Sequence, residues 1–311
     1  MDPLYLRFLL IFNWLHLNLV LICLWLVSVI LFYHRYFGFT AKPLKEFDPQ
    51  RFSLAIFGDC QGADNPFTSL RPTYFVFNNL LDSINSRLPL ATVILGDMVV
   101  SGRAYHYYRF RQQLGRLRTL LYPVLGNHDL KHAGRDFFTN IFGPTYYSSC
   151  LGLNTFLFLD NAAGSIDSQQ MEWLETQLKN NQGNRLYVFM HQPLFDPRPG
   201  QSYAMSDRAQ AKKLQELFTR AKVTAVFTSH LHGYYSAVQD EIHYYITGGG
   251  GSTLTSPQDY YHYLLLHIDH DQFNIEIVKI SPFPSVSLFL RWLWQFSLWG
   301  LVLWLTFSLV R

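Results

Sequence analysis

The sequence has few charged residues and few cysteines, and each shortage excludes a class of protein. Aspartate, glutamate, lysine and arginine make up 15% of the chain, against about 25% in an ordinary soluble domain. The net charge of +3 is too small for the basic surface that nucleic acids require. The three cysteines, Cys23, Cys60 and Cys150, show no spacing typical of a disulfide framework. We therefore expect neither a nucleic-acid-binding protein nor a small disulfide-stabilised domain.

Apolar residues are abundant instead, at 49% of the chain, and they concentrate near both ends. Residues 9–33 and 292–310 are nearly uncharged, and each run is long enough to cross about 30 Å of hydrocarbon as a helix. A cleaved signal peptide is the alternative for the first run, but the run is long for one and lacks an Ala-x-Ala site. A buried amphipathic helix is the alternative for the second, but that run is apolar all round. The sequence predicts an N-terminal transmembrane anchor (1–37) and a C-terminal transmembrane helix (287–311).

The charges beside these two runs predict an orientation. Basic residues are more numerous on the central side of both runs, which favours a cytoplasmic central domain by the positive-inside rule. We therefore expect a multi-pass membrane protein with two spanning helices. Residues 38–50, which contain two prolines and show no periodicity, are predicted to be a linker to a globular domain over 51–281.

Within the central domain, short apolar runs alternate with amphipathic helical patterns. The runs that predict buried strands are residues 52–57, 91–95, 120–125, 155–159, 186–190 and 223–227. The helical patterns cover residues 71–87, 103–119, 169–180 and 206–221, and shorter strands follow at 242–247, 261–268 and 273–280. Residues 137–147 are predicted to form a loop and turn. This order predicts an α/β fold with a parallel core.

Polar residues follow five of the predicted strands, at the point where each strand ends. They are Asp59 and Gln61, Asp97, Asn127 with His128 and Asp129, His191, and His230 with His232. Each residue alone would more often be a turn or capping residue. Because parallel strands bring their carboxyl ends to one edge of a sheet, five such clusters together indicate a functional site there.

In order and spacing, these clusters resemble the motifs of the calcineurin-like metallophosphoesterases. The matching residues over positions 50–281 are Asp59-x-Gln61, Gly96-Asp97, Gly126-Asn127-His128-Asp129, His191 and Ser229-His230-x-His232. The resemblance implies a four-layer αββα sandwich, flanked in this chain by the two predicted transmembrane helices. It also implies a metal-dependent phosphoric ester hydrolase.

The resemblance further implies a pair of divalent metal ions and a mechanism. Asp97 would bridge the two ions, with Asp59, Gln61 and His232 completing one site and Asn127, His191 and His230 the other. Imidazole and oxygen ligands suit manganese, iron or zinc. A hydroxide that bridges the ions would attack the phosphorus, and His128 would be the general acid. The expected substrate is a phosphomonoester or phosphodiester, and a membrane anchor suggests a lipid-linked one. The oligomeric state is left open.

Three departures from the family pattern leave alternatives open. Gln61 stands where histidine is usual, Ser229 replaces a glycine, and Val100 stands where many members carry an aspartate that orients the catalytic histidine. The alternatives are a non-catalytic membrane protein that binds metal or phosphate, and a phosphoprotein phosphatase. Arg198 is interpreted either as a phosphate ligand or as a structural loop residue. The glycines at 248–251 would form either a phosphate cradle or, as we favour, a tight bend.

Overall fold

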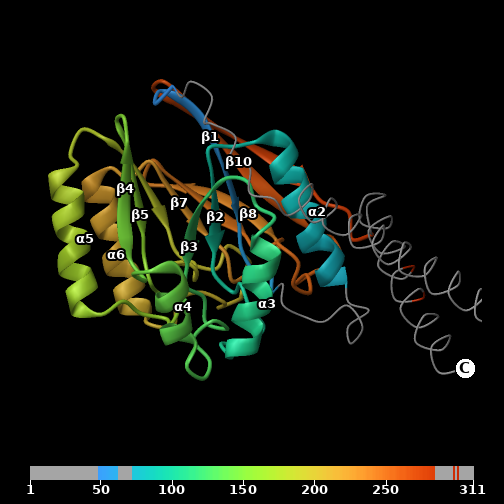
Figure 1. Ribbon diagram of the computed structural model, residues 1–311. Helices are drawn as coiled ribbons and strands as arrows, with labels where there is room; N and C mark the ends of the chain where they lie inside the picture. The colour runs from blue at the N-terminus through green and yellow to red at the C-terminus, as the bar shows by residue number, and fades with distance from the viewer. Residues whose placement is uncertain (1–47, 62–71, 284–296, 298–299, 301–311) are drawn as a thin grey trace, which may run out of the picture. The chain divides into compact units, whose positions relative to one another are not determined.

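Two mixed β-sheets form the centre of the computed structural model, which describes residues 48–61, 72–283, 297 and 300 (Figure 1). The first sheet has the strand order β11-β10-β1-β2-β3, and the second has the order β4-β5-β6-β7-β9-β8. The strands of the first sheet are β1 (Arg51–Phe57), β2 (Ala91–Leu95), β3 (Leu120–Val124), β10 (His262–Asp269) and β11 (Gln272–Lys279). Those of the second are β4 (Tyr147–Leu151), β5 (Asn154–Phe158), β6 (Arg185–Phe189), β7 (Ala225–Thr228), β8 (Tyr234–Gln239) and β9 (Ile242–Thr247).

Helices cover the outer faces of the two sheets. The helices are α2 (Pro72–Arg87), α3 (Ala104–Leu114) and α4 (Gly134–Phe142) on the first sheet, and α5 (Ser168–Asn180) and α6 (Arg208–Ala221) on the second (Figure 1). Phe77 of α2 shares a hydrophobic core with the first sheet, and Leu174 of α5 shares another with the second. A third core, which contains Ile56 and Phe189, lies between the two sheets. The layers are therefore helix, sheet, sheet and helix, which agrees with the predicted sandwich.

The parallel strands place their carboxyl ends at a common edge. In the first sheet β1, β2 and β3 run parallel, and Leu95 pairs with Val124 at the ends of β2 and β3. In the second sheet β5, β6 and β7 run parallel, with Phe189 of β6 paired with Phe227 of β7. The predicted β-α-β-α-β order of the first half is thereby confirmed. The polar clusters begin immediately after these strand ends.

Several elements differ from the sequence prediction. Helix α3 ends at Leu114 rather than Thr119, because Gly115 caps it with an N–H bond to the Arg111 carbonyl. Helix α4 occupies part of the predicted loop at 137–147, and Phe138 of α4 packs in the core of the first sheet. Strands β4 and β8 were not predicted, because each lies at an edge of the second sheet and has no continuous apolar run.

The prediction of a multi-pass membrane protein with a cytoplasmic domain is contradicted. Within residues 48–61 and 72–283, no helix has the length and apolar character needed to cross a membrane. The longest helix of this part, α2, has 16 residues and reaches about 24 Å at 1.5 Å per residue, short of the roughly 30 Å hydrocarbon layer. The two runs predicted to span, residues 9–33 and 292–310, lie outside the described residues except for positions 297 and 300.

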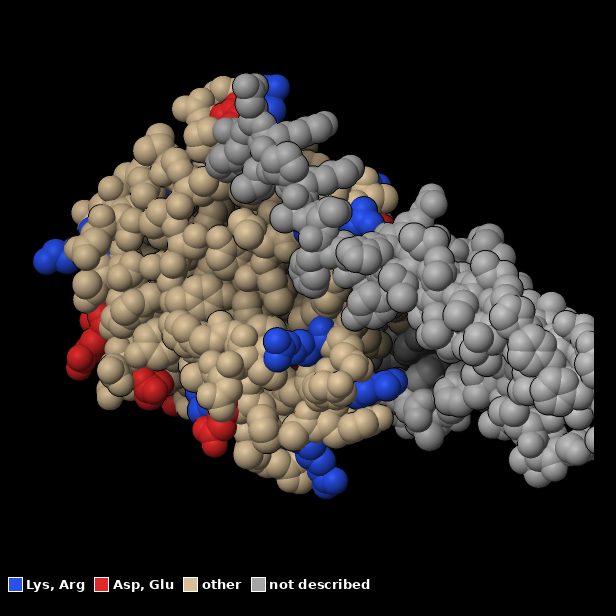
Figure 2. Space-filling model, viewed as in Figure 1, with Lys and Arg blue, Asp and Glu red and all other residues tan. Residues whose placement is uncertain are grey.

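Charged side chains are sparse on the face shown in Figure 2, as the composition predicts. Basic side chains lie near α3, and the surface elsewhere on this face is mainly uncharged. In α3, Tyr107 and Phe110 point into the core, which leaves the arginines of this helix on its outer side. The basic face of α3 is therefore a solvated helix face.

Candidate metal centre

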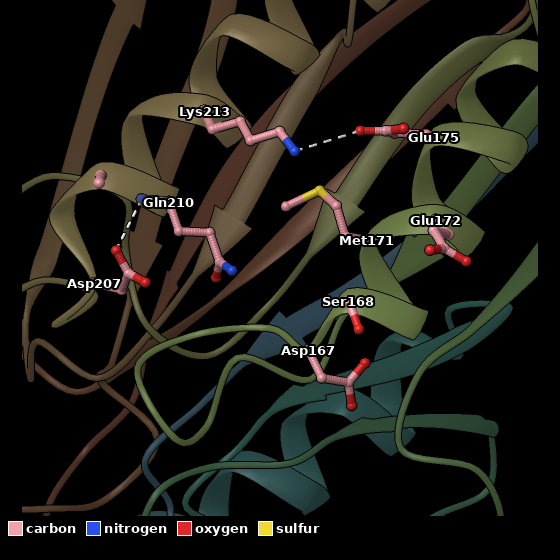
Figure 3. Close-up of a pocket in the computed structure, with 9 residues that line it drawn as sticks. Asp167, Ser168, Met171, Glu172, Glu175, Asp207, Gln210 and Lys213 are labelled. Carbon is pink, nitrogen blue, oxygen red and sulfur yellow. Dashed lines mark hydrogen bonds and ion pairs between the residues drawn. The ribbon is translucent and has the colours of Figure 1, made fainter.

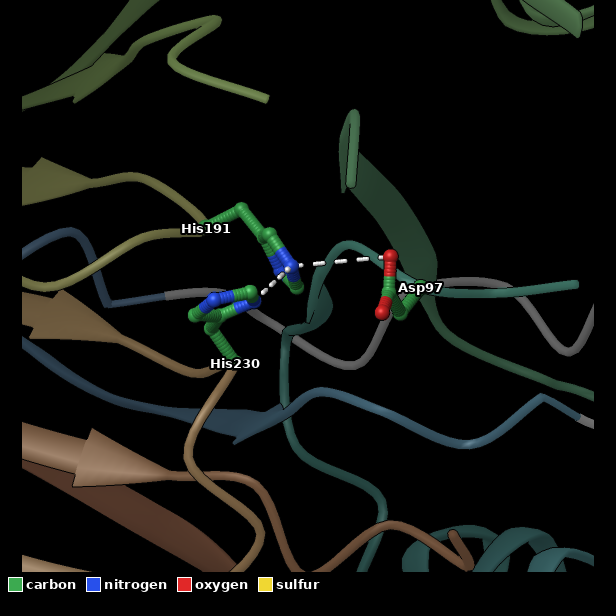
Figure 4. A group of neighbouring side chains, drawn as sticks. All are labelled: Asp97, His191 and His230. Carbon is green, nitrogen blue, oxygen red and sulfur yellow. Dashed lines mark hydrogen bonds and ion pairs between the residues drawn. The ribbon is translucent and has the colours of Figure 1, made fainter. Parts of the chain in front are cut away.

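Polar side chains from both sheets meet at the shared edge. Asp97 follows β2, His191 follows β6 and His230 follows β7, and one ligand atom from each lies within 4.8 Å of the other two (Figure 4). His191 lies at the middle of this group. Its Nε2 atom is 3.5 Å from Asp97 Oδ1 and 3.1 Å from His230 Nδ1. Residues separated by up to 133 positions in sequence thus form one cluster.

Two glycines permit this close approach. A Cβ atom on Gly126 would lie 2.1 Å from the backbone nitrogen of Asp97, and one on Gly96 would lie 2.7 Å from Nδ1 of His191. Gly96 also has a φ of +87°, which side chains rarely permit. The glycines that precede Asp97 and Asn127 are therefore required for the two strand ends and His191 to pack together.

The hydrogen bonds of His191 leave a lone pair directed into the cluster. Its Nδ1 lies 2.7 Å from the Leu95 carbonyl, which can only accept, so Nδ1 carries the proton. In the neutral ring Nε2 is then an acceptor, yet it lies 2.8 Å from Oδ1 of Asn127 and 3.5 Å from Oδ1 of Asp97. Two oxygen acceptors and Nδ1 of His230 therefore converge on Nε2, and a positive charge at this point would stabilise them. This arrangement fits a metal cation.

Asp59 and His232 repeat this pattern beside the first group. Oδ2 of Asp59 accepts hydrogen bonds from the Ser229 hydroxyl and from the backbone N–H of His230, the latter at 2.8 Å. Among the described residues nothing hydrogen-bonds Oδ1, although this atom is buried and lies 3.4 Å from Nε2 of His232. Nδ1 of His232 is 2.7 Å from the Thr253 carbonyl. A backbone carbonyl that orients the ring is typical of metal-binding histidines.

The electrostatics of the cluster also fit added cations. Burial and the neighbouring Asp59 raise the pKa of Asp97 to about 7. Burial would raise the pKa of Asp59 as well, but the adjacent His232 outweighs it and holds the value at about 2. For His230, burial and the nearby His191 lower the pKa to about 3. For His232, burial alone would lower the pKa, but the adjacent Asp59 outweighs burial and raises the pKa to about 9. Two buried carboxylates together with imidazole nitrogens form a donor set suited to divalent metal ions.

Four of the predicted ligand residues have an unusual backbone conformation. The φ angles of Asp59, Gln61, Asp97 and His230 are 57°, 40°, 49° and 68°. Left-handed conformations of this kind cost roughly 1–2 kcal/mol for residues other than glycine, and they concentrate at functional sites. The unusual conformations therefore coincide with the predicted site.

Gln61 is placed less directly than the other predicted ligands. Its backbone N–H donates to the carbonyl of Asp97 at 2.9 Å, which holds residue 61 at the edge of the cluster. No hydrogen bond joins its side chain to the cluster within the described part of the chain. The structure therefore brings together the side chains of Asp59, Asp97, Asn127, His191, His230 and His232. Gln61 is held beside them by the hydrogen bond of its backbone N–H.

His128 lies beside the same cluster and is held by a backbone carbonyl. Its N–H donates to Oδ1 of Asp97 at 2.7 Å, and its Nε2 lies 4.0 Å from Oδ2 of Asp97. Its Nδ1 lies 2.8 Å from the carbonyl of Val100, the residue that replaces the orienting aspartate of the family pattern. Lys131 Nζ is 3.2 Å from the same nitrogen. The carbonyl of Val100 therefore provides the acceptor that the side chain lacks, and it leaves Nε2 facing the cluster.

Sequence reasoning gave no role to two groups that support the site, the side chain of Asp129 and the carbonyl of Thr253. Asp129 is buried and accepts hydrogen bonds from the N–H groups of Gly126 at 2.9 Å and Val99 at 3.0 Å, which ties two site loops together. Its place in the Asn127-His128-Asp129 cluster was a usable signal. The Thr253 carbonyl had none, because backbone acceptors leave no trace in a sequence.

The structure also bears on the two features with open interpretations. A Cβ atom on Gly248 would lie 2.3 Å from the Leu231 carbonyl, and one on Gly249 would lie 2.2 Å from Nδ1 of His262. These contacts support the tight bend. Arg198 donates two side-chain hydrogen bonds to Asp196, which supports its interpretation as a structural loop residue.

A separate hollow of about 550 Å³ lies between the first turns of α5 and α6 (Figure 3). Asp167 and Asp207 cap those helices by accepting from Gln170 N and Gln210 N. The hollow contains none of the cluster residues. Its two aspartates are thus explained by helix capping.

Comparisons with known proteins bear on the family and the fold. The sequence model of the calcineurin-like phosphoesterase family matches residues 52–234. The chain is 32% identical over 117 residues to the glycerophosphodiester phosphodiesterase GpdQ of Enterobacter lignolyticus, covering 34% of this chain and 42% of that protein. It is 27% identical over 200 residues to the serine/threonine-protein phosphatase CPPED1 of Pongo abelii, covering 56% and 63%. A solved dimetal phosphatase from Danio rerio has a TM-score of 0.61 at 12% identity, covering 76% of this chain and 98% of that one.

The family model covers more than half of the chain, so the chain belongs to the calcineurin-like phosphoesterase family. This confirms the family resemblance, and it agrees with the expected class of metal-dependent phosphoric ester hydrolase. The chain spans about half the length of the curated relatives it matches. At 12% identity, the solved structure supports the fold alone.

Proposed function

We propose that this protein hydrolyses phosphomonoester or phosphodiester bonds at a two-metal centre, within a catalytic domain spanning residues 51–281. The observation that carries the proposal is the convergence of acceptor atoms around Nε2 of His191. Nearby, the buried Oδ1 of Asp59 has no hydrogen bond among the described residues. Divalent cations would satisfy this oxygen and would offset the crowding of acceptors around Nε2 of His191.

The geometry suggests how the ligands divide. Asp97 would contact both ions. Its Oδ1 lies 3.5 Å from Nε2 of His191, and the charge of Asp59 is close enough to raise its pKa. One ion would be held by Asp59 and His232 with the amide of Gln61, and the other by the side chains of Asn127, His191 and His230. We propose manganese, iron or zinc, because the donors are imidazole and oxygen. When bound, such a pair lowers the pKa of a coordinated water and neutralises charge that develops on the phosphoryl oxygens.

His128 is the residue best placed to protonate the leaving group. Its Nδ1 proton is held by the Val100 carbonyl, and its side chain is 30% exposed. Nε2 therefore faces the cluster and solvent, where a proton on this nitrogen would reach a departing alkoxide. The positive Lys131, beside the same ring, lies where it can attract an anionic substrate.

This orientation of His128 favours catalysis over the non-catalytic alternative. The two departures that best support a binding protein are Gln61 and Val100, and Val100, in place of the family aspartate, is the reason that concerns His128. Because the Val100 carbonyl performs the orienting contact at 2.8 Å, that reason loses its force. The relatives include both a phosphodiesterase and a protein phosphatase, so both substrate classes need to be assayed.

The test is hydrolysis by the full chain after metals are stripped and manganese is restored. The substrates are bis-p-nitrophenyl phosphate, p-nitrophenyl phosphate and a phosphoserine peptide. His128→Ala should lower kcat by about 10²- to 10⁴-fold, the usual contribution of a general acid. The control is His132→Asn, a nearby exposed histidine outside the cluster, where asparagine suits the φ of 60°.

The outcomes distinguish the alternatives. Manganese-dependent turnover that is lost in His128→Ala but kept in His132→Asn would support the proposal. Turnover that survives complete removal of metal would refute it. Two bound manganese ions without turnover of any of the three substrates would instead support a protein that binds metal or phosphate without catalysis.

A further inference from the structure

A clamped loop after His191 supports one face of the metal centre. The loop runs from Pro193 to Met205, and its base is closed by a hydrogen bond from Met205 N to the Pro193 carbonyl at 2.8 Å. Inside the loop the Asp196 side chain is 2% exposed. Its carboxylate accepts from Arg198 N and Nε at 3.0 Å, from Arg198 Nη2 at 2.8 Å, and from Tyr203 N at 2.8 Å. Both oxygens of one buried carboxylate therefore fix the path of the loop as far as Tyr203.

Tyr203 then lies flat against His230. The two ring centroids are 4.4 Å apart, and the ring planes differ by 7°. The His230 ring also meets the His191 ring edge to face, with centroids 5.0 Å apart. The plane of the imidazole is thus fixed by two rings, and Nδ1 of His230 is kept 3.1 Å from Nε2 of His191.

Other contacts do not account for this orientation of the ring. His230 donates its backbone N–H to Asp59, which fixes its main chain and leaves its χ angles free. Neither His191 nor His232 depends on Tyr203, because Leu95 and Thr253 carbonyls hold their rings. His230 has no equivalent carbonyl contact among the described residues. The stacked tyrosine occupies the role that a backbone acceptor fills for the other two histidines.

We propose that Tyr203 is a positioning residue for the metal centre, and that its ring, carried by the loop anchored on Asp196, holds His230 in the orientation that binds metal. This inference rests on the proposed metal site. It concerns the aromatic ring and not the phenolic hydroxyl. The 49% exposure of Tyr203 means that the ring is a wall of the open centre and not part of the hydrophobic core.

The charges that act on the Tyr203 hydroxyl are consistent with a position at the wall of the metal centre. Burial, and then the carboxylates of Asp59 and Asp97, raise the pKa of Tyr203, while Arg198 acts in the opposite direction. The phenol therefore lies within electrostatic reach of both carboxylates. Arg198 is bound to Asp196 on the same loop, so it contributes to the clamp that presents the ring.

The experiment measures manganese binding to the metal-stripped full chain by competition with a chromogenic chelator. Tyr203→Ala should weaken the binding of one of two ions by about 10-fold, since partners that orient a ligand contribute roughly 10- to 100-fold to metal affinity. Tyr203→Phe should stay within about twofold of wild type, because the ring remains. Tyr105→Ala is the control: Tyr105 is 55% exposed and lies beside His106, with centroids 5.9 Å apart, outside the cluster.

A second variant, Asp196→Asn, weakens the clamp without touching the metal centre. It should also reduce affinity for one ion, by a smaller factor than Tyr203→Ala, with the fold checked by circular dichroism. Wild-type affinity in Tyr203→Ala, or equal losses in Tyr203→Phe and Tyr203→Ala, would overturn the inference. Because binding is measured without substrate, failure of hydrolysis with two bound ions would count against the proposed function only. A wild-type chain that binds no divalent ion would overturn both.

Discussion

Ser229 offers a sharp test of the centre, because its hydroxyl has one identifiable task. It stands where the family pattern has glycine, it is fully buried, and it donates to Oδ2 of Asp59, itself fully buried. Ser229→Ala removes that hydroxyl and leaves Oδ2 with the N–H of His230 as its remaining donor. The perturbation is therefore confined to one hydrogen bond of one carboxylate.

The expected magnitude follows from the charge of the acceptor. Hydrogen bonds to charged groups contribute about 1.5–3 kcal/mol, and the loss is not recovered when the carboxylate stays buried. We expect the free energy of unfolding of the metal-free chain to fall by about 2 kcal/mol. The Asp59 carboxylate would also be held by one donor instead of two, so manganese affinity should fall by about 10-fold or more.

Urea unfolding of the metal-free chain and chelator competition with manganese measure the two effects. Ser252→Ala is a matched control, because Ser252 is 2% exposed and its hydroxyl has no hydrogen-bond partner among the described residues. That control should match wild type in metal affinity and lose no stability. If Ser229→Ala also matched wild type in both measurements, the reasoning about Asp59 would be wrong.

Three further predictions follow from other contacts. Gly248→Ala should destabilise the chain and weaken manganese binding, because the new Cβ would lie 2.3 Å from the Leu231 carbonyl and 2.8 Å from Oδ2 of Asp59. The control is Gly115→Ala, at a helix end with right-handed backbone, which should change neither stability nor manganese affinity. Equal effects of the two variants in calorimetric melting would contradict the predicted clash at residue 248. His262 is fully buried, and burial lowers its pKa to about 4. In the unfolded chain this histidine has its ordinary pKa of about 6.5, so below pH 6.5 the unfolded chain binds more protons than the folded chain. Stability should therefore fall between about pH 6.5 and 4 by about 3 kcal/mol, and His262→Gln should lose that pH dependence in urea titrations; an unchanged slope would show that another group is responsible. The hydrogen bond from Arg198 outweighs burial and lowers the pKa of Asp196 to about 2. The ionised Asp196 therefore stabilises the fold above its ordinary pKa of about 4, and this stabilisation is lost as the pH falls toward 2. Asp196→Asn should flatten that part of the acid unfolding curve, and an unaltered curve would contradict the role of Asp196 in holding the loop.

The parallel core was predictable because its strands are buried on both faces. Val93 and Phe189 lie in continuous apolar runs that end at glycine or at a polar cluster, and such runs are easily read from a sequence. Edge strand β4 was missed because alternate residues along it are exposed. Helix α4 was missed because the whole helix has only nine residues, too few for its apolar side, which includes Phe138, to show a clear helical period.

The site was predictable as a set of residue types but not as a set of contacts. Asp97, His191 and His230 were identified because strand ends carry the chemistry of such sheets. The group that holds His128 was not, since the Val100 carbonyl is a backbone atom and any residue at position 100 could offer it. Tyr203 was missed for a related reason, because its contact with His230 depends on the path of a loop that the buried Asp196 fixes.

The predicted membrane location is contradicted, since no helix of the described residues is long and apolar enough to cross a membrane. Apolar runs near the ends satisfy a length criterion, but they carry no information about what surrounds them. In the described part of the chain, the apolar residues are used in three cores between helices and sheets. Apolar content is therefore explained there by packing.

Equilibrium dialysis of the metal-stripped full chain against manganese tests the central claim most directly. The wild-type chain should bind two ions, and Asp97→Asn should bind at most one, because Asp97 would contact both. Asp207→Asn provides an isosteric control, since Asp207 caps α6 outside the cluster and asparagine caps helices equally well. No bound ion in the wild type, or two ions in Asp97→Asn with unchanged affinity, would contradict the account.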